Sequence, residues 1–129
     1  MGDPAYLSAD VVAFRDTFRS FLAAEVVPHL PEWERARRVP REFWLAMGRS
    51  GFLCPWLAEA DGGSAAPFGF SVVILEELGR TGFMGVQTGV SVHSDVVVPY
   101  LDQLLTGDLR LRWLPACASG QAITAIGMT

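Results

Sequence analysis

The chain has 129 residues, of which 50% are hydrophobic and 19% are charged. This composition supplies the core of about one globular domain and excludes a disordered chain. The formal net charge is −4, which excludes the basic surface that nucleic-acid binding requires.

The N-terminal stretch MGDPAYLSAD lacks a basic region followed by an apolar block, so we predict no secretory signal. No uncharged apolar run approaches the ~18 residues of a membrane span. We therefore expect a cytoplasmic protein. Cys54 and Cys117 lie far apart in apolar surroundings, which favours two buried thiols, although a disulfide between them stays possible.

The first predicted helix starts at Ser8, whose hydroxyl can cap it, and ends at Pro28. Apolar residues recur along it at helical spacing: Val11, Phe14, Phe18, Phe21, Leu22 and Val26. The following stretch, HLPEWERARRVP, has two prolines and is predicted to be a polar connector. A second helix opens at Pro40 and stops at Gly51, and a loop of about a dozen residues follows it.

A third helix follows Pro67 and is apolar around most of its circumference, which predicts burial; Glu76 and Arg80 can pair on its remaining face. The fourth pattern, GVQTGVSVHSDVVVPYLDQLLTG, is a long helix that we expect Pro99 to kink. A short helix capped by Asp108 ends near Pro115. The last stretch, QAITAIGMT, is rich in β-branched residues and is predicted to be a strand. The sequence thus predicts an all-α, up-down bundle of four to five helices with one strand at its C-terminus.

Six segments, in order, together resemble the acyl-CoA dehydrogenase family, in particular the N-terminal helical domain of its long-chain branch. They are FRDTFRSFLAAEVVPHLPEWE, VPREFWLAMGRSGFLCP, DGGSAAPFGFSVVILEELGRTG, HSDVVVPYL, RWLPACASGQ and AITAIGMT. The resemblance implies that residues 1–121 form this helical domain and that residues 122–129 are the first strand of a truncated middle β-barrel domain.

The family resemblance also implies a function for the parent protein. It implies bound FAD, α,β-dehydrogenation of acyl-CoA thioesters, and an electron-transfer flavoprotein or another acceptor as partner. It further implies a homotetramer or a homodimer. The family's general base is a glutamate of the C-terminal domain, so we expect no catalytic residue in this chain and no activity from it alone.

Two groups of binding residues follow from the resemblance. Ile126, Met128 and Thr129 match residues beside the flavin ring, where oriented donors stabilise the negative charge of the reduced flavin. The alternative is that they are ordinary strand residues. Gln87, Thr88, Val90 and Ser91 match the far end of the acyl pocket. Small residues here predict a deep or wide slot for longer or branched acyl chains, and close helix packing is the alternative.

The adjacent residues His93, Ser94 and Asp95 suggest a catalytic triad, but neighbours on a helix point about 100° apart and cannot form one. We expect His93 to be a hydrogen-bonded core or interface histidine. The cysteine and histidine spacings match no zinc site, so we expect no bound metal. Besides the dehydrogenase fragment, the sequence admits a non-catalytic bundle that binds a partner or a lipid chain. It also admits a related flavin oxidase or monooxygenase partner.

Overall fold

The fold was analysed in a computed structural model, which describes residues 4–129. These described residues fold into helices and connecting segments, which confirms the predicted all-α class. The α-helices are α1 (Ala9–Glu25), α2 (Leu30–Ala36), α3 (Arg41–Arg49), α4 (Phe68–Arg80), α5 (Met84–Ser91), α6 (Val98–Leu104) and α7 (Gly107–Ala118). Short 3₁₀ turns span Val27–His29 and Glu59–Asp61, and a π-helix spans Val92–Val97. No helix in the described part of the chain is long and apolar enough to cross a membrane.

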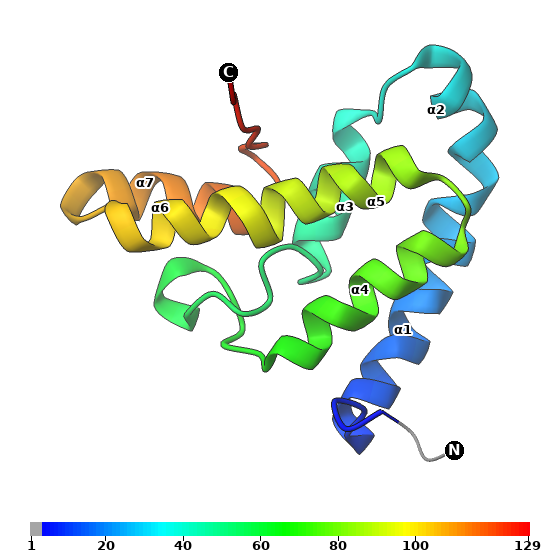
Figure 1. Ribbon diagram of the computed structural model, residues 1–129, viewed down its shortest axis with the longest axis horizontal. Helices are drawn as coiled ribbons and strands as arrows, with labels where there is room; N and C mark the ends of the chain where they lie inside the picture. The colour runs from blue at the N-terminus through cyan, green and yellow to red at the C-terminus, as the bar shows by residue number, and fades with distance from the viewer. Residues whose placement is uncertain (1–3) are drawn as a thin grey trace.

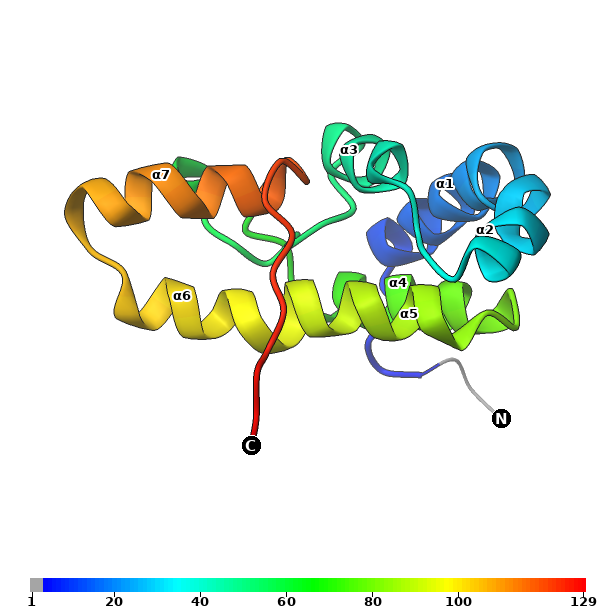
Figure 2. The ribbon, with the colours of Figure 1, turned by 90° about the horizontal axis from the view of Figure 1, so that it is seen from above.

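The helices lie in two layers (Figures 1 and 2). One layer holds α4 and a long helical rod in which α5, the π-helix and α6 follow one another without a break. The other layer holds α1, α2, α3 and α7. The C-terminal segment leaves the end of α7 and crosses the middle of the rod, as Figure 2 shows. This crossing brings the end of the chain beside the π-helix.

The predicted pattern of α1 is confirmed. The Ser8 side chain accepts a hydrogen bond from the Val11 N–H, as expected for an N-cap residue. Val11 and Phe18 are buried, and Phe18 packs edge-to-face on Phe52 with ring centroids 4.7 Å apart. The apolar stripe of α1 therefore faces the core, as its spacing requires.

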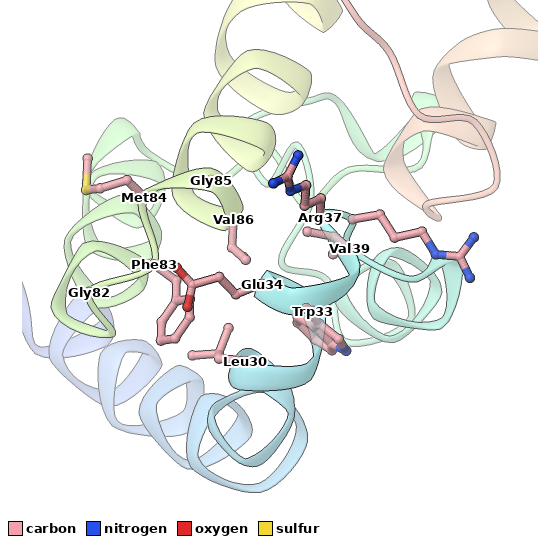
Figure 3. Close-up of a pocket in the computed structure, with 11 residues that line it drawn as sticks. Leu30, Trp33, Glu34, Arg37, Val39, Gly82, Phe83, Met84, Gly85 and Val86 are labelled. Atoms are coloured by element: carbon pink, nitrogen blue, oxygen red, sulfur yellow. The ribbon is translucent and has the colours of Figure 1, made fainter.

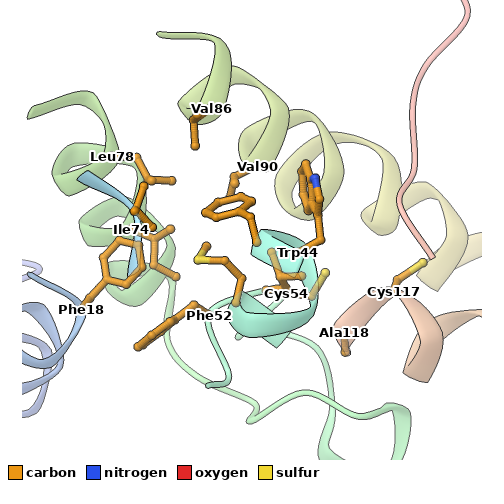
Figure 4. Close-up of a cluster of buried hydrophobic side chains, with 14 of the residues drawn as sticks. Phe18, Trp44, Phe52, Cys54, Ile74, Leu78, Val86, Val90, Cys117 and Ala118 are labelled. Atoms are coloured by element: carbon orange, nitrogen blue, oxygen red, sulfur yellow. The ribbon is translucent and has the colours of Figure 1, made fainter. Parts of the chain in front are cut away.

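One continuous core joins the two layers (Figure 4). Its fully buried side chains come from nearly every helix and from the connector after α3, and they include Phe18, Met47, Leu53, Leu57, Leu78, Val90 and Leu114. Each such side chain contributes about 1.5–3 kcal/mol of transfer free energy relative to an exposed one. Both cysteines are free and buried, as predicted.

The predicted polar connector was wrong, because it contains helix α2. Pro31 lies in the first turn of α2, where a missing N–H costs nothing. The helix ends at Arg37, which adopts a left-handed conformation with φ 50°. Pro31, predicted to lie in a connector, is therefore part of a helix start.

The predicted kink at Pro99 takes the form of the π-helix. The Val98 N–H bonds to the carbonyl of His93, five residues back, instead of that of Ser94. Pro99 has no N–H to offer, so the Ser94 carbonyl would lack a donor. The indole N–H of Trp56 fills that place, with its nitrogen 2.9 Å from the Ser94 oxygen. The wider turn thus accommodates the proline without breaking the rod.

The last helix also differs from its prediction. Its N-cap is Thr106, with no side-chain cap bond, and Asp108 lies in the first turn. Pro115 lies inside the helix, which continues to Ala118. Beyond it the described residues form no strand: the segment from 123 to 129 runs out as a single trace without the hydrogen-bonded neighbouring segment that a strand needs (Figure 2).

Two buried carboxylates join separate elements. Glu77 of α4, 4% exposed, accepts two hydrogen bonds from the Arg19 guanidinium of α1, at 2.7 and 2.9 Å. Arg80 pairs with Glu77 at 3.4 Å, so the predicted pair between Arg80 and Glu76 was wrong. Asp61 is held in the same two-pronged way by Arg110 of α7, at 3.0 and 2.6 Å. These buried charges are therefore paired.

Candidate functional site

The segment after α7 is fixed first by close backbone packing against α3. A Cβ atom on Gly120 would lie 2.1 Å from the Trp44 carbonyl oxygen, and one on Gly48 would lie 2.1 Å from the Ser119 carbonyl. Gly120 also has a φ of 75°, which only glycine adopts readily. The two glycines let α3 and the turn after α7 touch at their backbones, and this contact sets where the C-terminal segment starts.

Two hydrogen bonds then guide the segment onward. The Ala122 N–H donates to the Ala116 carbonyl at 2.9 Å, and the Arg41 guanidinium donates to the Gln121 carbonyl. With the glycine contact, they fix the path of the chain through Ala122.

His93 holds the next point of the segment. It lies on the π-helix and is fully buried. Its Nε2 lies 3.0 Å from the carbonyl oxygen of Cys117, and its Nδ1 accepts the N–H of Thr124 at 3.1 Å. The Thr124 hydroxyl oxygen is 3.0 Å from the same Nδ1. Because a carbonyl can only accept and an amide N–H can only donate, the ring hydrogen belongs on Nε2.

The cluster around His93 is electrically neutral. Burial lowers the pKa of the imidazole, with a smaller opposing effect from the Cys117 carbonyl. Burial also raises the pKa of the Cys54 thiol to about 12 and raises that of the Cys117 thiol. Two protonated thiols and a neutral ring offer neither a thiolate nucleophile nor a charged acid. His93 is therefore a hydrogen-bonded core histidine, as predicted.

The neighbours of His93 form no catalytic chain with it. The Ser94 hydroxyl accepts the backbone N–H of Cys54 at 3.2 Å. Asp95 is half-buried, and burial raises the pKa of its carboxyl to about 6. The His93 ring nitrogens contact Cys117, Thr124 and, at 4.0 Å, the Cys54 sulfur, and neither contacts Ser94 or Asp95, so the sequence-based argument against a triad is consistent with the geometry.

The predicted flavin residues follow this anchor directly. Ile126 is 43% exposed, Met128 is 82% exposed, and Thr129 is exposed. They lie two, four and five residues beyond Thr124, on the exposed end of the chain. These residues follow one another along the chain end that runs out past the rod (Figure 2), and their contact with a flavin stays a prediction.

The four predicted acyl-pocket residues point in different directions from α5. Val90 is buried in the core. Gln87 turns toward α4, where its amide donates to the Leu75 carbonyl at 3.1 Å. Thr88 is exposed and Ser91 is half-buried; being three residues apart, these two share a face of the helix. The pocket assignment stays a prediction; Val90 is buried, whereas Gln87, Thr88 and Ser91 are each at least partly exposed.

An open hollow of about 650 Å³ lies at the start of α5 (Figure 3). Its floor is apolar and includes Leu30, Phe83 and Val86, and the side chains of Glu34, Arg37 and Arg38 lie around it. The hollow ends at Val86, one residue before Gln87, so its lining contains none of the predicted acyl-pocket residues. It is a separate feature of the surface.

Several residues that shape the site were missed from the sequence. Thr124 contacts His93, 31 residues away, and Arg41 bonds to Gln121, 80 residues away. No local sequence pattern indicates such contacts. Gly48 and Gly120 could have been suspected, because a glycine inside a helix and another just after one often mark close contacts.

The chain is similar to acyl-CoA dehydrogenases in both sequence and structure. Residues 8–121 match the family described as acyl-CoA dehydrogenase, N-terminal domain. The long-chain specific acyl-CoA dehydrogenase of Mus musculus mitochondria is 37% identical over 116 residues, which cover 90% of this chain and 26% of the relative. The mitochondrial isovaleryl-CoA dehydrogenase of Bos taurus is 27% identical over 126 residues, covering 95% of this chain and 29% of the relative.

A solved structure of an acyl-CoA dehydrogenase from Geobacillus kaustophilus superposes with a TM-score of 0.91 at 46% identity, covering 97% of this chain and 32% of that protein. A glutaryl-CoA dehydrogenase from Mycobacterium smegmatis, solved in complex with FADH2, shares the fold at a TM-score of 0.83 and 23% identity, covering 92% of this chain and 30% of that protein. The chain thus spans about a third or less of these relatives. It belongs to the acyl-CoA dehydrogenase family, in which it corresponds to the N-terminal domain.

Proposed function

We propose that this chain forms the N-terminal helical part of an FAD-dependent enzyme that removes two hydrogens across Cα–Cβ of an acyl-CoA thioester. The observation that carries the proposal is the family match over residues 8–121, together with a C-terminal segment held beside the rod. We further propose an electron-transfer flavoprotein or another acceptor as the redox partner, and a homotetramer or homodimer as the assembly. The cytoplasmic location stays a prediction, since the mammalian relatives are named as mitochondrial.

The exposed end of the chain suits the edge of a flavin ring. Ile126 and Met128 present apolar side chains to solvent, which a flat aromatic ring system can cover. The backbone N–H groups beyond Thr124 have no protein acceptor in the described part of the chain. Oriented N–H donors of this kind, with the Thr129 hydroxyl, stabilise negative charge on a bound group. FAD, when bound, would supply the acceptor for the hydride that leaves the β-carbon.

We assign no general base to this chain. Glu77 and Asp61, the two buried carboxylates among residues 4–129, are each held by an arginine through two hydrogen bonds. Both oxygens of each carboxylate are thus already bonded to a guanidinium. The chain's proposed contribution is therefore to shape the acyl slot and to border the flavin.

The test uses the full translation product that contains this chain. We expect a purified protein with a flavin absorbance spectrum, which acyl-CoA thioesters bleach in the absence of an acceptor and which reduces an artificial dye when one is present. A flavin-free protein that reduces no dye with acyl-CoAs of short, medium, long or branched chain would refute the proposal.

A second experiment tests the acyl slot. Ser91→Trp fills the half-buried position on α5, so we expect long acyl chains to lose kcat/KM by at least tenfold relative to short ones. Ser20→Trp makes the same change at an exposed site on α1 and should leave this preference unaltered. Unchanged long-chain activity in the Ser91 variant would remove the slot from α5.

A further inference from the structure

His93 is the last fixed point before the exposed end of the chain. Contacts before it hold the segment only as far as Ala122. Thr124 is then bonded to His93 through its N–H, and in the described structure no later residue makes a hydrogen bond to another part of the chain. The five residues from 125 to 129 therefore take their direction from the bond at Thr124.

The ring that makes this bond is itself held on three sides. Its Nε2–H donates to the Cys117 carbonyl of α7. Its face meets the Trp44 indole of α3 nearly edge-on, with centroids 5.5 Å apart and planes at 72°. Its backbone belongs to the π-helix, so the ring is carried by the rod. A ring fixed in this way presents its Nδ1 lone pair in one direction only.

A bond to one N–H also sets the orientation of the residues that follow. In an extended chain, successive N–H groups point to opposite edges and successive side chains to opposite faces. With the Thr124 N–H facing His93, the N–H groups of Gly127 and Thr129 would face the other edge. If the bond to His93 came from the N–H of a neighbouring residue instead of Thr124, the N–H groups on the two edges would exchange places, and so would the side chains on the two faces.

We propose that His93 is a positioning residue: by accepting the Thr124 N–H it sets the register of residues 124–129, and so decides which of their backbone donors and side chains are presented to the flavin. The step from register to flavin rests on the function proposed above. The step from His93 to register does not, because it concerns this chain alone.

The test uses two substitutions in the 129-residue chain, each of which keeps the hydrogen-bonding role of one ring nitrogen of His93 and removes that of the other. Asn places its side-chain oxygen near the position of Nδ1 and can accept the Thr124 N–H, but it loses the donor to Cys117. Gln places its side-chain amide near Nε2 and can donate to Cys117, but it loses the acceptor for Thr124. The readout is hydrogen exchange of the Thr124 amide by NMR, with circular dichroism to compare helix content.

We expect the wild-type Thr124 amide to exchange on the order of tenfold more slowly than a free amide, since a hydrogen bond of this kind has about that effect. His93→Gln should remove the protection, and His93→Asn should keep it to within about twofold. If both variants lose protection equally, or both keep it, His93 is a packing residue only and the proposal is overturned. A wild-type amide that exchanges at the free rate also overturns it.

A measurement on the wild-type chain covers the case in which a variant fails to fold. Long-range ¹H–¹⁵N spectra report which nitrogen of a histidine carries the hydrogen. We expect the hydrogen of His93 on Nε2; a hydrogen on Nδ1 would overturn the proposal, because that nitrogen could not accept. None of these measurements involves FAD, so a failure here leaves the proposed enzyme activity standing, and a flavin-free translation product leaves this register result standing.

Discussion

The backbone contact between α3 and the turn after α7 gives a sharp prediction for Gly48→Ala. The new Cβ would lie 2.1 Å from both the carbon and the oxygen of the Ser119 carbonyl, whereas real Cβ contacts almost never fall below 3.0 Å. The obstacle is main chain, which cannot rotate away as a side chain can. The turn after α7 must therefore retreat from α3 by about 1 Å.

The size of the effect follows from two opposing contributions. Overpacking costs about 1–3 kcal/mol and occasionally more, and a clash with backbone belongs at the upper end of that range. Replacing a helical glycine by alanine returns about 1 kcal/mol. We expect Gly48→Ala to lower the free energy of unfolding by about 2 kcal/mol, which corresponds to a fall in Tm of roughly 5–10 °C for a domain of this size.

Gly85→Ala is the matched control, since Gly85 lies in α5 with no atom within 4 Å of its Cβ position. It should raise the free energy of unfolding by up to about 1 kcal/mol. Thermal and urea unfolding, followed by far-ultraviolet circular dichroism, compare both variants with the wild type. If Gly48→Ala is as stable as the control, the close contact and the path it gives the C-terminal segment are wrong.

Three further outcomes can be measured on the same chain. Arg110→Lys loses the pair of hydrogen bonds to buried Asp61 and should lower the free energy of unfolding in urea by about 1–3 kcal/mol. Arg112→Lys, at an exposed position, is the control and should change it little. Equal losses in the two variants would contradict the ion-pair argument. Burial raises the pKa of Asp95 from 3.8 to about 6, so its contribution to stability is fully present below pH about 3.8 and is lost as the pH rises through about 6. Asp95→Asn should remove that part of the stability-versus-pH curve, and an unchanged curve would show that the carboxyl is not so buried. The chain should also self-associate through large apolar residues exposed on α4 and the rod, which include Phe68, Met84, Tyr100 and Leu104. Light scattering measures this, and a monomer at high concentration would contradict it.

Local patterns in the sequence predicted most of the helices correctly. The cap at Ser8 and the apolar spacing after it act within a few residues, so they define α1 without knowledge of the rest of the fold. Helix α2 was missed because a proline can either end a helix or begin one, and Pro31 does the second. The choice depends on whether the helix finds a core to pack on, which a short polar stretch does not reveal.

The candidate site was only partly predictable, for a related reason. The sequence pointed to His93 as a hydrogen-bonded core residue, because a histidine on an apolar stripe needs partners. It could not identify Thr124 as one of them, because that contact depends on the turn at Gly120 and on the wider π-helix. Both are responses of the backbone to tertiary packing, and neither has a periodicity that the sequence displays.

The π-helix in the middle of the rod changes the phase between the two ends of the rod. Val90, before it, is buried, and so is Val98 after it, where α6 packs on α7. If residues 92–97 formed a regular α-helix with no residue deleted, the α6 side chains would turn by about 100° about the axis, away from α7, because a π-helix takes up one residue more than the α-helix it replaces. The extra residue of the π-helix therefore lets one uninterrupted helix pack against different neighbours along its length, with no loop between its two halves.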